Sequence, residues 1–373
     1  MRKALIVIFC LLVIGGAGAN AVWQLWLKEE VHRAIAAASE ANGSGNGDMK
    51  TGRPKVPDDP NFGTYRDPIT DELEAFRMEV KKRMTARDFA GLDTLADEVR
   101  TKRLRFGMGS WKIVQFYDAL ELSAKLGDDV WQERLATLRE WQHQQPLSIT
   151  PRVALANALT DYAWKARGTE YAAKVKQEGW KLFAERLAEA WTVLKDATEI
   201  PAKDPYWWSV AQTVALGQQW PREDYEKLFG EAIAFEPEFW GYYTKKAYFL
   251  LPRWSGKPGE WESFAEESIN EPGGLGPEVY ARIVINLNSY YQQIFHESKA
   301  RWDLTKAGFE KIRERYPDST EMLSEFAMLA AQGNDAKCSR EMFDALGDRI
   351  DRRTWKSKDR YLYYYRYSHP EAK

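Results

Sequence analysis

A phenylalanine and an alanine recur at fixed distances from the breaks between the predicted helices. The Phe positions, eight residues before three prolines and before Asp351, are Phe229, Phe264, Phe309 and Phe343. The Ala positions, ten residues after four prolines, are Ala156, Ala211, Ala247 and Ala327. A small residue lets two helices approach closely, a Phe fills the groove to the next pair, and proline ends a helix. The recurrence therefore predicts helix pairs that stack in series.

The breaks of this repeat at Pro237, Pro272, Pro317 and Asp351 are 35, 45 and 34 residues apart. Pro272 departs from the alanine rule, because Arg282 stands ten residues after it. An insertion at 273–277 accounts for both the departure and the longer spacing.

Amphipathic segments fill the remainder of the folded region. The first predicted helix begins near Pro68 with Thr70 at its start, and the second has Asp88 as its N-cap. The later helices are predicted at about 107–126, 129–144, 150–168, 177–198, 204–219, 222–235, 238–252, 258–269, 277–295, 298–315, 319–332 and 335–346.

The Phe and Ala offsets resemble those of the tetratricopeptide repeat, whose unit of about 34 residues ends in a proline. The resemblance is clearest over 223–351 and extends back towards Pro146. It implies an all-α fold, a right-handed superhelix of stacked antiparallel helix pairs (a solenoid) behind an N-terminal apolar segment.

Three segments also resemble a bacterial family known as domain of unknown function 4034. They are GMGSWKIVQFYDAL (107–120), ITPRVALANALTDYAWKARG (149–168) and FLLPRWSGKPGEW (249–261). This resemblance covers most of 70–345 and implies no activity.

The first 21 residues have a basic start, an apolar run and a small-residue end, Ala19-Asn20-Ala21, that fits a leader peptidase site. They predict a signal peptide and a periplasmic or secreted protein. The alternative is an inner-membrane anchor, because residues 4–22 approach the about 20 apolar residues that span a bilayer. If the segment is not cleaved, the membrane is expected to contact the chain only through residues 4–22.

Three further regions follow the leader. Residues 22–67 are poor in large apolar residues over much of their length, which predicts a flexible linker. Residues 68–351 form the predicted helical repeat domain. The tail, 352–373, is expected to cap the last repeat by covering its apolar face, and the alternative is a peptide-like docking segment.

The sequence carries no motif for a cofactor, a metal or catalysis. Cys10 lies in the leader, which leaves Cys338 as the one remaining cysteine, and the four histidines are scattered without metal-binding spacing. No phosphate-binding loop and no GxSxG motif are present. The net charge of -2 gives no reason to expect nucleic-acid binding.

Aromatic and basic residues gather between 207 and 257. Two consecutive aromatic residues cannot face the same side of a helix, so at least one of each pair is expected to reach a concave surface or a partner. The usual role of such aromatic residues is packing between repeats, and the usual role of a loop such as 251–259 is that of a rigid connector, so the binding role is a hypothesis beside these. The candidate partner-binding residues are Trp207, Trp208, Trp240, Tyr242, Tyr243, Arg253, Trp254 and Lys257.

These observations favour a non-enzymatic scaffold that binds a protein or peptide in the cell envelope. The alternative is an (α/α) toroid enzyme acting on envelope carbohydrate. Such an enzyme needs two carboxylates about 5 to 9.5 Å apart in a cleft. A closed arrangement of helices with paired carboxylates facing tryptophan would favour the enzyme.

Overall fold

The computed structural model describes residues 64–168 and 175–370, and within these ranges it is helical, with one isolated bridge between Arg105 and Trp111 and no strand. The described helices are α3 (Pro68–Thr85), α4 (Phe89–Thr101), α5 (Lys112–Leu120), α6 (Asp128–Gln144), α7 (Thr150–Arg167), α8 (Gln177–Ala197), α9 (Pro205–Gly217), α10 (Arg222–Phe235), α11 (Trp240–Phe249), α12 (Glu260–Ser268), α13 (Pro277–Leu287), the 3-10 helix η2 (Asn288–Tyr290), α14 (Ile294–Glu297), α15 (Trp302–Arg315), α16 (Thr320–Gln332), α17 (Ala336–Leu346), α18 (Arg352–Trp355) and α19 (Lys358–Ser368).

The predicted leader at 1–21 and most of the predicted linker at 22–67 lie outside the described residues. Among the helices that are described, none is both long and apolar enough to cross a bilayer.

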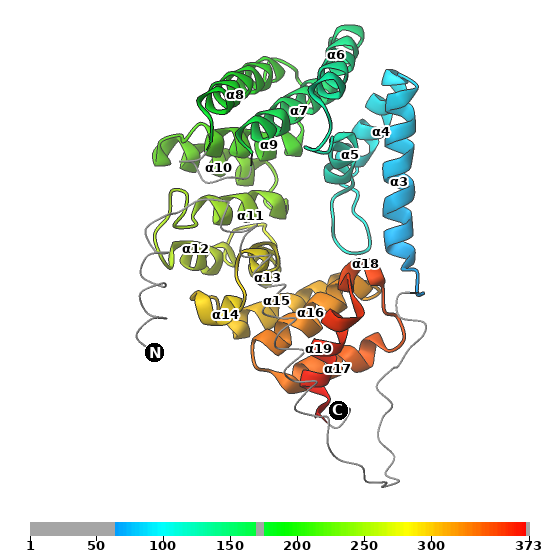
Figure 1. The fold of residues 1–373 in the computed structure, drawn as a ribbon, viewed down its shortest axis with the longest axis vertical. Helices are drawn as coiled ribbons and strands as arrows, with labels where there is room; N and C mark the ends of the chain where they lie inside the picture. Colours follow the sequence, from blue (N-terminus) through cyan, green and yellow to red (C-terminus); the bar gives the residue numbers. More distant parts are fainter. Residues whose placement is uncertain (1–63, 169–174, 371–373) are drawn as a thin grey trace.

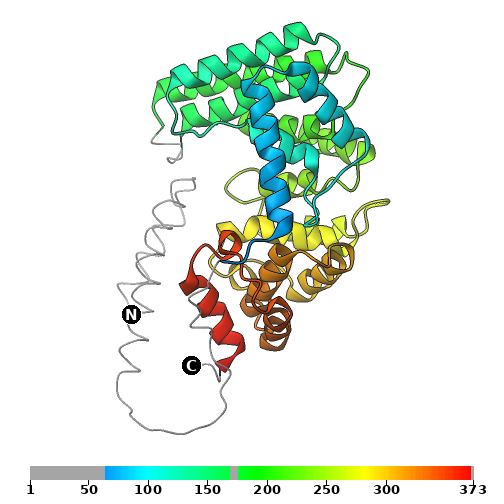
Figure 2. The same cartoon turned by 90° about the vertical axis from the view of Figure 1, so that its right-hand side faces the viewer.

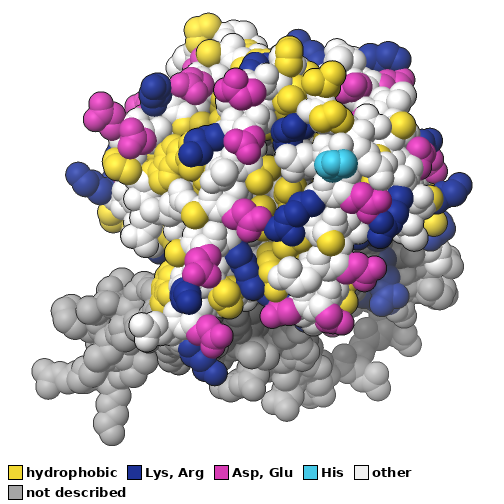
Figure 3. Space-filling view, turned by 90° about the horizontal axis from the view of Figure 1, so that it is seen from above, with side chains coloured by type: hydrophobic (Ala, Val, Ile, Leu, Met, Phe, Trp, Pro, Cys, Tyr) yellow, Lys and Arg dark blue, Asp and Glu magenta, His cyan; other side chains and the backbone are white. Residues whose placement is uncertain are grey.

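From α6 onwards, the helices follow one another in chain order along the molecule (Figure 1). α6 to α8 lie at one end, α9 to α13 in the middle and α15 to α19 at the other end. Consecutive helices pack together, as α7 does with α8 and α16 with α17. Alternate helices also touch, as α7 does with α9, α9 with α11 and α11 with α13. The surface at the α6 to α8 end mixes charges of both signs with small hydrophobic patches (Figure 3).

α3 spans from the α6 to α8 end of the molecule to its opposite end, as two perpendicular views agree (Figures 1 and 2). At its beginning, the Asp67 carboxylate accepts a hydrogen bond of 2.9 Å from the Thr320 hydroxyl, 253 residues away in the sequence. Arg353 forms ion pairs of 3.2 Å with Asp71 and 3.0 Å with Glu74. The described part of the chain therefore closes on itself.

The loop at 104–112 makes a second long-range connection, from the start of α5 to the middle helices. The Met108 carbonyl accepts a hydrogen bond of 2.9 Å from Arg282 Nη2, and the Gly109 carbonyl accepts one of 3.3 Å from Trp240 Nε1. Arg105 forms an ion pair of 2.8 Å with Glu238. These contacts hold α5 opposite α11 and α13.

The repeated Phe and Ala positions lie in helix interfaces, as predicted. The exposed fractions are 0% for all four alanines, and they are at most 8% for Phe229, Phe264, Phe309 and Phe343. The Phe229 and Phe264 rings meet edge to face at 5.5 Å, and the Phe309 ring stacks on Phe326 at 4.6 Å. The prediction that these positions seal neighbouring helices is confirmed.

Several predicted boundaries are wrong for local reasons. The segment predicted as a helix at 107–126 is helical only in α5, because Gly109 has a φ of 86° and turns the chain before it. Asp67, rather than Thr70, caps α3 by accepting from the Ile69 amide. The predicted 277–295 helix ends at Leu287, after which the Glu297 carboxylate accepts from the amides of Gln292 and Gln293. The predicted Asp88 cap is confirmed.

The C-terminal tail folds into α18 and α19, which pack on α16 and α17. Trp355 and Tyr361 are buried, and their rings lie 5.5 Å and 5.6 Å from the ring of Phe343. The tail thus covers the last repeat phenylalanine.

Candidate functional site

Three of the predicted partner-binding aromatic residues lie in the core. Trp207 donates a hydrogen bond of 2.9 Å to the Leu194 carbonyl, Tyr242 one of 2.7 Å to Pro205, and Tyr243 one of 2.9 Å to Pro237. Tyr242 and Tyr243 are exposed by 0% and 1%, because α11 is packed on both sides, by α9 and by α10 and α12. The expectation that one residue of this pair reaches a surface is therefore wrong.

Trp208 and Trp240 keep part of their surface in contact with solvent. The Trp208 ring stacks on the exposed ring of Phe235 at 4.5 Å and meets the ring of the buried Trp207 edge to face at 5.4 Å. Trp240 lies in the wall of a cavity between α5, α9, α11 and the end of α13.

The loop at 251–259 is tied to the helices by its aromatic and basic side chains. The Trp254 ring lies 6.0 Å from Trp164 and 5.8 Å from Tyr248. The Arg253 guanidinium lies 5.0 Å from the centre of the Tyr248 ring. Lys257 is exposed, and its backbone amide donates to the Glu260 carboxylate at 2.8 Å. These contacts anchor the 251–259 loop, as a connector, to the neighbouring helices.

The cavity beside Trp240, here called the central cavity, has a volume of about 370 Å³. Trp240, Tyr248 and Tyr290 form its half-buried walls, backed by the buried rings of Trp111, Tyr206 and Phe239. The end of α5 supplies Asp118 and Glu121, and the middle of α11 supplies Lys245. A cavity of this size with aromatic walls and a few convergent polar groups is typical of ligand-binding sites.

Carboxylates outnumber cations around the central cavity. Asp161 of α7 faces Glu121 across a small adjoining hollow, and these two carboxylates and Asp118 all interact electrostatically with Lys245. Asp118 also pairs with Arg77 at 3.4 Å. The Lys245 ammonium donates to the Thr213 hydroxyl at 2.8 Å rather than forming a close ion pair with a carboxylate.

The surrounding protein disfavours the charged forms of these groups. Removal from water, and next the Glu121 carboxylate, raise the pKa of Asp118 to about 7 and the pKa of Asp161 to about 8. Removal from water also raises the pKa of Glu121 and lowers the pKa of Lys245. The site thus holds carboxylates that change protonation near neutral pH, a property common at functional sites.

Replacement of both Asp118 and Asp161 by Asn is expected to stabilise the protein more at high pH than at low pH. Their folded-state pKa values exceed the unfolded value of about 3.9, so the wild type loses stability as the pH rises from about 4 to about 8. We expect the free energy of unfolding of the Asn variant, relative to that of wild type, to be about 1 to 3 kcal/mol higher at pH 8.5 than at pH 5.5.

Urea unfolding at the two pH values measures this difference. Burial also raises the pKa of Glu325 on α16 to about 7, but this contribution is present in both proteins and cancels in the comparison. The control is Asp128→Asn, because its partner Lys165 lowers the pKa of this exposed carboxylate. An equal gain at both pH values for the double variant would contradict the assignment of raised pKa values.

Sequence reasoning missed the charged residues of the central cavity. Asp118, Asp161 and Lys245 lie on three different helices, 43 to 127 residues apart. A local signal existed, since each interrupts a run of apolar or aromatic residues: KIVQFYDAL, ALANALTDYAW and WGYYTKKAYF. Nothing in the spacing of the sequence indicated that they meet.

In the described part of the chain, no three His, Cys, Asp or Glu side chains are grouped so as to hold a metal ion. Comparison with known proteins found no matching family model, no matching curated protein and no matching solved structure.

Proposed function

We propose that this chain is a non-enzymatic helical-repeat scaffold of the cell envelope. In this proposal, the stacked antiparallel helix pairs form a right-handed superhelix related to tetratricopeptide repeats. The central cavity binds a Lys or Arg side chain of a protein or peptide partner, and the N-terminal segment directs the chain to the envelope.

The excess of recessed carboxylates over cations is the observation that supports this role. Asp118 and Glu121 line the central cavity and Asp161 lines the adjoining hollow, all three with raised pKa values. Lys245 and Arg77 are the cations near them. A Lys or Arg side chain entering the cavity would favour the ionised form of these carboxylates and form charge-assisted hydrogen bonds.

The test is fluorescence anisotropy with a fluorescein-labelled Lys-Gly-Lys-Gly-Lys peptide at low and at high salt. We expect wild type to bind it and to bind the matching Gln-Gly-Gln-Gly-Gln peptide at least tenfold more weakly. Because loss of a desolvated charge pair costs about 2 to 5 kcal/mol, the Asp118→Asn/Glu121→Gln variant should bind the lysine peptide at least tenfold more weakly than wild type does.

The matched control is Glu223→Gln/Asp224→Asn, which removes the same net charge from the exposed first turn of α10. This control should bind the lysine peptide as wild type does. If both double variants weaken binding equally, then general surface charge rather than the central cavity attracts the peptide, and the proposal fails.

A second candidate function is hydrolysis of envelope carbohydrate. It is favoured by the contacts that close the described part of the chain on itself and by Asp118 and Glu121 lining one cavity with Trp240, the arrangement expected of such an enzyme. A pKa of about 7 for Asp118 suits a general acid. The test is release of reducing ends from purified peptidoglycan. Release by wild type that is lost in the Asp118→Asn/Glu121→Gln variant would show that the chain is an enzyme and contradict the scaffold proposal.

A further inference from the structure

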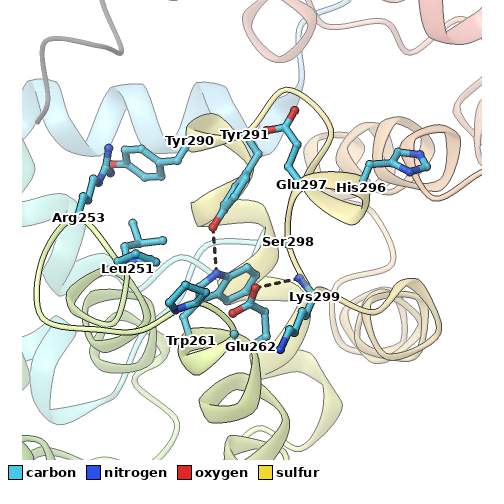
Figure 4. A pocket seen from close by; sticks show the side chains of 13 residues that line it. Leu251, Arg253, Trp261, Glu262, Tyr290, Tyr291, His296, Glu297, Ser298 and Lys299 are labelled. Carbon is cyan, nitrogen blue, oxygen red and sulfur yellow. Dashed lines mark hydrogen bonds between the residues drawn. The ribbon is translucent and has the colours of Figure 1, made fainter. Parts of the chain in front are cut away.

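A second cavity, of about 500 Å³, lies beside α12 between the loop at 251–259 and residues 290–299 (Figure 4). The rings of Tyr290 and Tyr291 form one side, and Trp261 and Glu262 of α12 form the other. Both tyrosines keep part of their surface exposed, whereas Trp261 is buried and donates to the Tyr291 hydroxyl at 3.0 Å. We call it the α12 cavity.

The charges around the α12 cavity balance without forming ion pairs. Arg253 and Lys299 are its two permanent cations, and Glu262 and Glu297 are its two carboxylates. Among the described residues none of these four groups takes part in an ion pair within 4.0 Å. The carboxylates are held by backbone amides instead, and Glu262 accepts from the Lys299 amide at 2.9 Å.

The α12 cavity contains hydrogen-bond donors and acceptors that have no partner within the described residues. Glu262 is only 4% exposed, and its Oε2 has no hydrogen-bond partner within the described residues. Nε and Nη2 of Arg253 likewise lack one there, while its guanidinium carbon lies 4.3 Å from the centre of the Tyr290 ring. Buried polar groups without partners are costly, so a ligand that supplies both donors and acceptors would stabilise this site.

This combination selects against a net charge on the ligand. For an anion, the attraction of Arg253 and Lys299 is offset by repulsion from Glu262 and Glu297, and for a cation the roles are reversed. A neutral molecule with several hydroxyl groups avoids both penalties, since each hydroxyl donates and accepts. The partly exposed tyrosine rings add apolar surface for the ring carbons of such a molecule.

We propose that the α12 cavity is a non-catalytic binding site for a saccharide. Glu262 accepts hydrogen bonds from the sugar hydroxyls, Arg253 and Lys299 donate to them, and Tyr290 and Tyr291 pack on the sugar ring. The volume is in the range of small-molecule sites, about 300 to 1,000 Å³, and suits one or two sugar rings. The α12 cavity and the central cavity share Tyr290 as a wall, but their charged residues are different. The saccharide proposal therefore does not depend on the function proposed for the central cavity.

The test is saturation-transfer NMR on the purified protein with four sugars, N-acetylglucosamine, chitobiose, maltose and cellobiose, and with glycine and acetate as a zwitterion and an anion. We expect at least one sugar to bind and glycine and acetate not to bind. The Glu262→Gln variant should bind that sugar about five- to tenfold more weakly, because a hydrogen bond to a charged acceptor is stronger than one to an amide.

The matched control is Glu310→Gln on the exposed side of α15, and it should bind the sugar as wild type does. Glu262→Gln retains a carbonyl oxygen for the Lys299 amide, so thermal melting should show it folded. The proposal is overturned if no sugar binds, if glycine or acetate binds more tightly, or if Glu262→Gln binds as wild type does.

Discussion

Replacement of Asp204 by Ala is expected to destabilise the protein by about 3 to 5 kcal/mol, the cost of breaking a buried ion pair from one side. Asp204 is 0% exposed and caps α9 by accepting from the Tyr206 amide at 2.8 Å. Its second carboxylate oxygen accepts from Arg100 and from the Tyr117 hydroxyl, both at 2.7 Å. The variant leaves a buried guanidinium and a buried hydroxyl without this acceptor, in addition to an uncapped helix.

Urea unfolding followed by circular dichroism measures the loss, and Asp97→Ala provides the matched control. Asp97 also pairs with Arg100, but its side chain is 60% exposed, so its removal should cost less than about 1 kcal/mol. Equal losses in the two variants would mean that burial of Asp204 does not determine its contribution. The comparison is sharp because both carboxylates bind the same guanidinium.

Asp204 also illustrates which features of the fold could be predicted from sequence. The predicted helix at 204–219 and the observed α9 nearly coincide, because Asp before Pro is a strong helix-start signal that depends on neighbouring residues only. The Phe and Ala offsets succeeded for a similar reason. Helix periodicity and a regular repeat require the same residue types at the same offsets, so Phe309 and Ala327 could be placed in interfaces without coordinates.

The closure of the chain and the charged site could not be predicted in this way. Thr320 meets Asp67, and Lys245 meets Asp118, through the path of the whole chain, which no local pattern records. Tyr242 and Tyr243 show the same limit. The helical pattern correctly places consecutive side chains on different sides of α11, but only the tertiary contacts show that both sides are covered.

Arg282 departs from the repeat pattern, and the structure gives the reason. It stands where other repeats have a buried alanine, yet it is only 5% exposed. Its long side chain passes into the 104–112 loop, where it donates to the Met108 carbonyl, and pairs with Glu278 at 3.1 Å. Space for it exists because residue 109 is glycine: a Cβ there would lie 2.2 Å from Arg282 Nη2.

Replacement of Arg282 by Ala is therefore expected to cost about 2 to 4 kcal/mol and to loosen the 104–112 loop. The expected loss in the free energy of unfolding is smaller than for Asp204→Ala, because Glu278, which is 1% exposed, keeps its ion pair of 3.0 Å with Arg315. Urea unfolding measures the energy, and faster amide hydrogen exchange at Phe106 and Gly109 reports the loop. Arg301→Ala, which removes a 51% exposed arginine from ion pairs on α15, should cost less than about 1 kcal/mol.

The double variant Arg282→Met/Glu278→Leu separates the two origins of the loss. If the cost of Arg282→Ala comes mainly from the buried Glu278 carboxylate, which then has Arg315 as its remaining ion-pair partner, filling the site with apolar side chains should recover at least half of the stability. Exchange in the loop should stay fast, because the hydrogen bond to Met108 is still missing. Slow exchange in the double variant would show instead that packing against Trp240 and Tyr316 is sufficient to hold the loop, and that the guanidinium contributes only charge balance for Glu278.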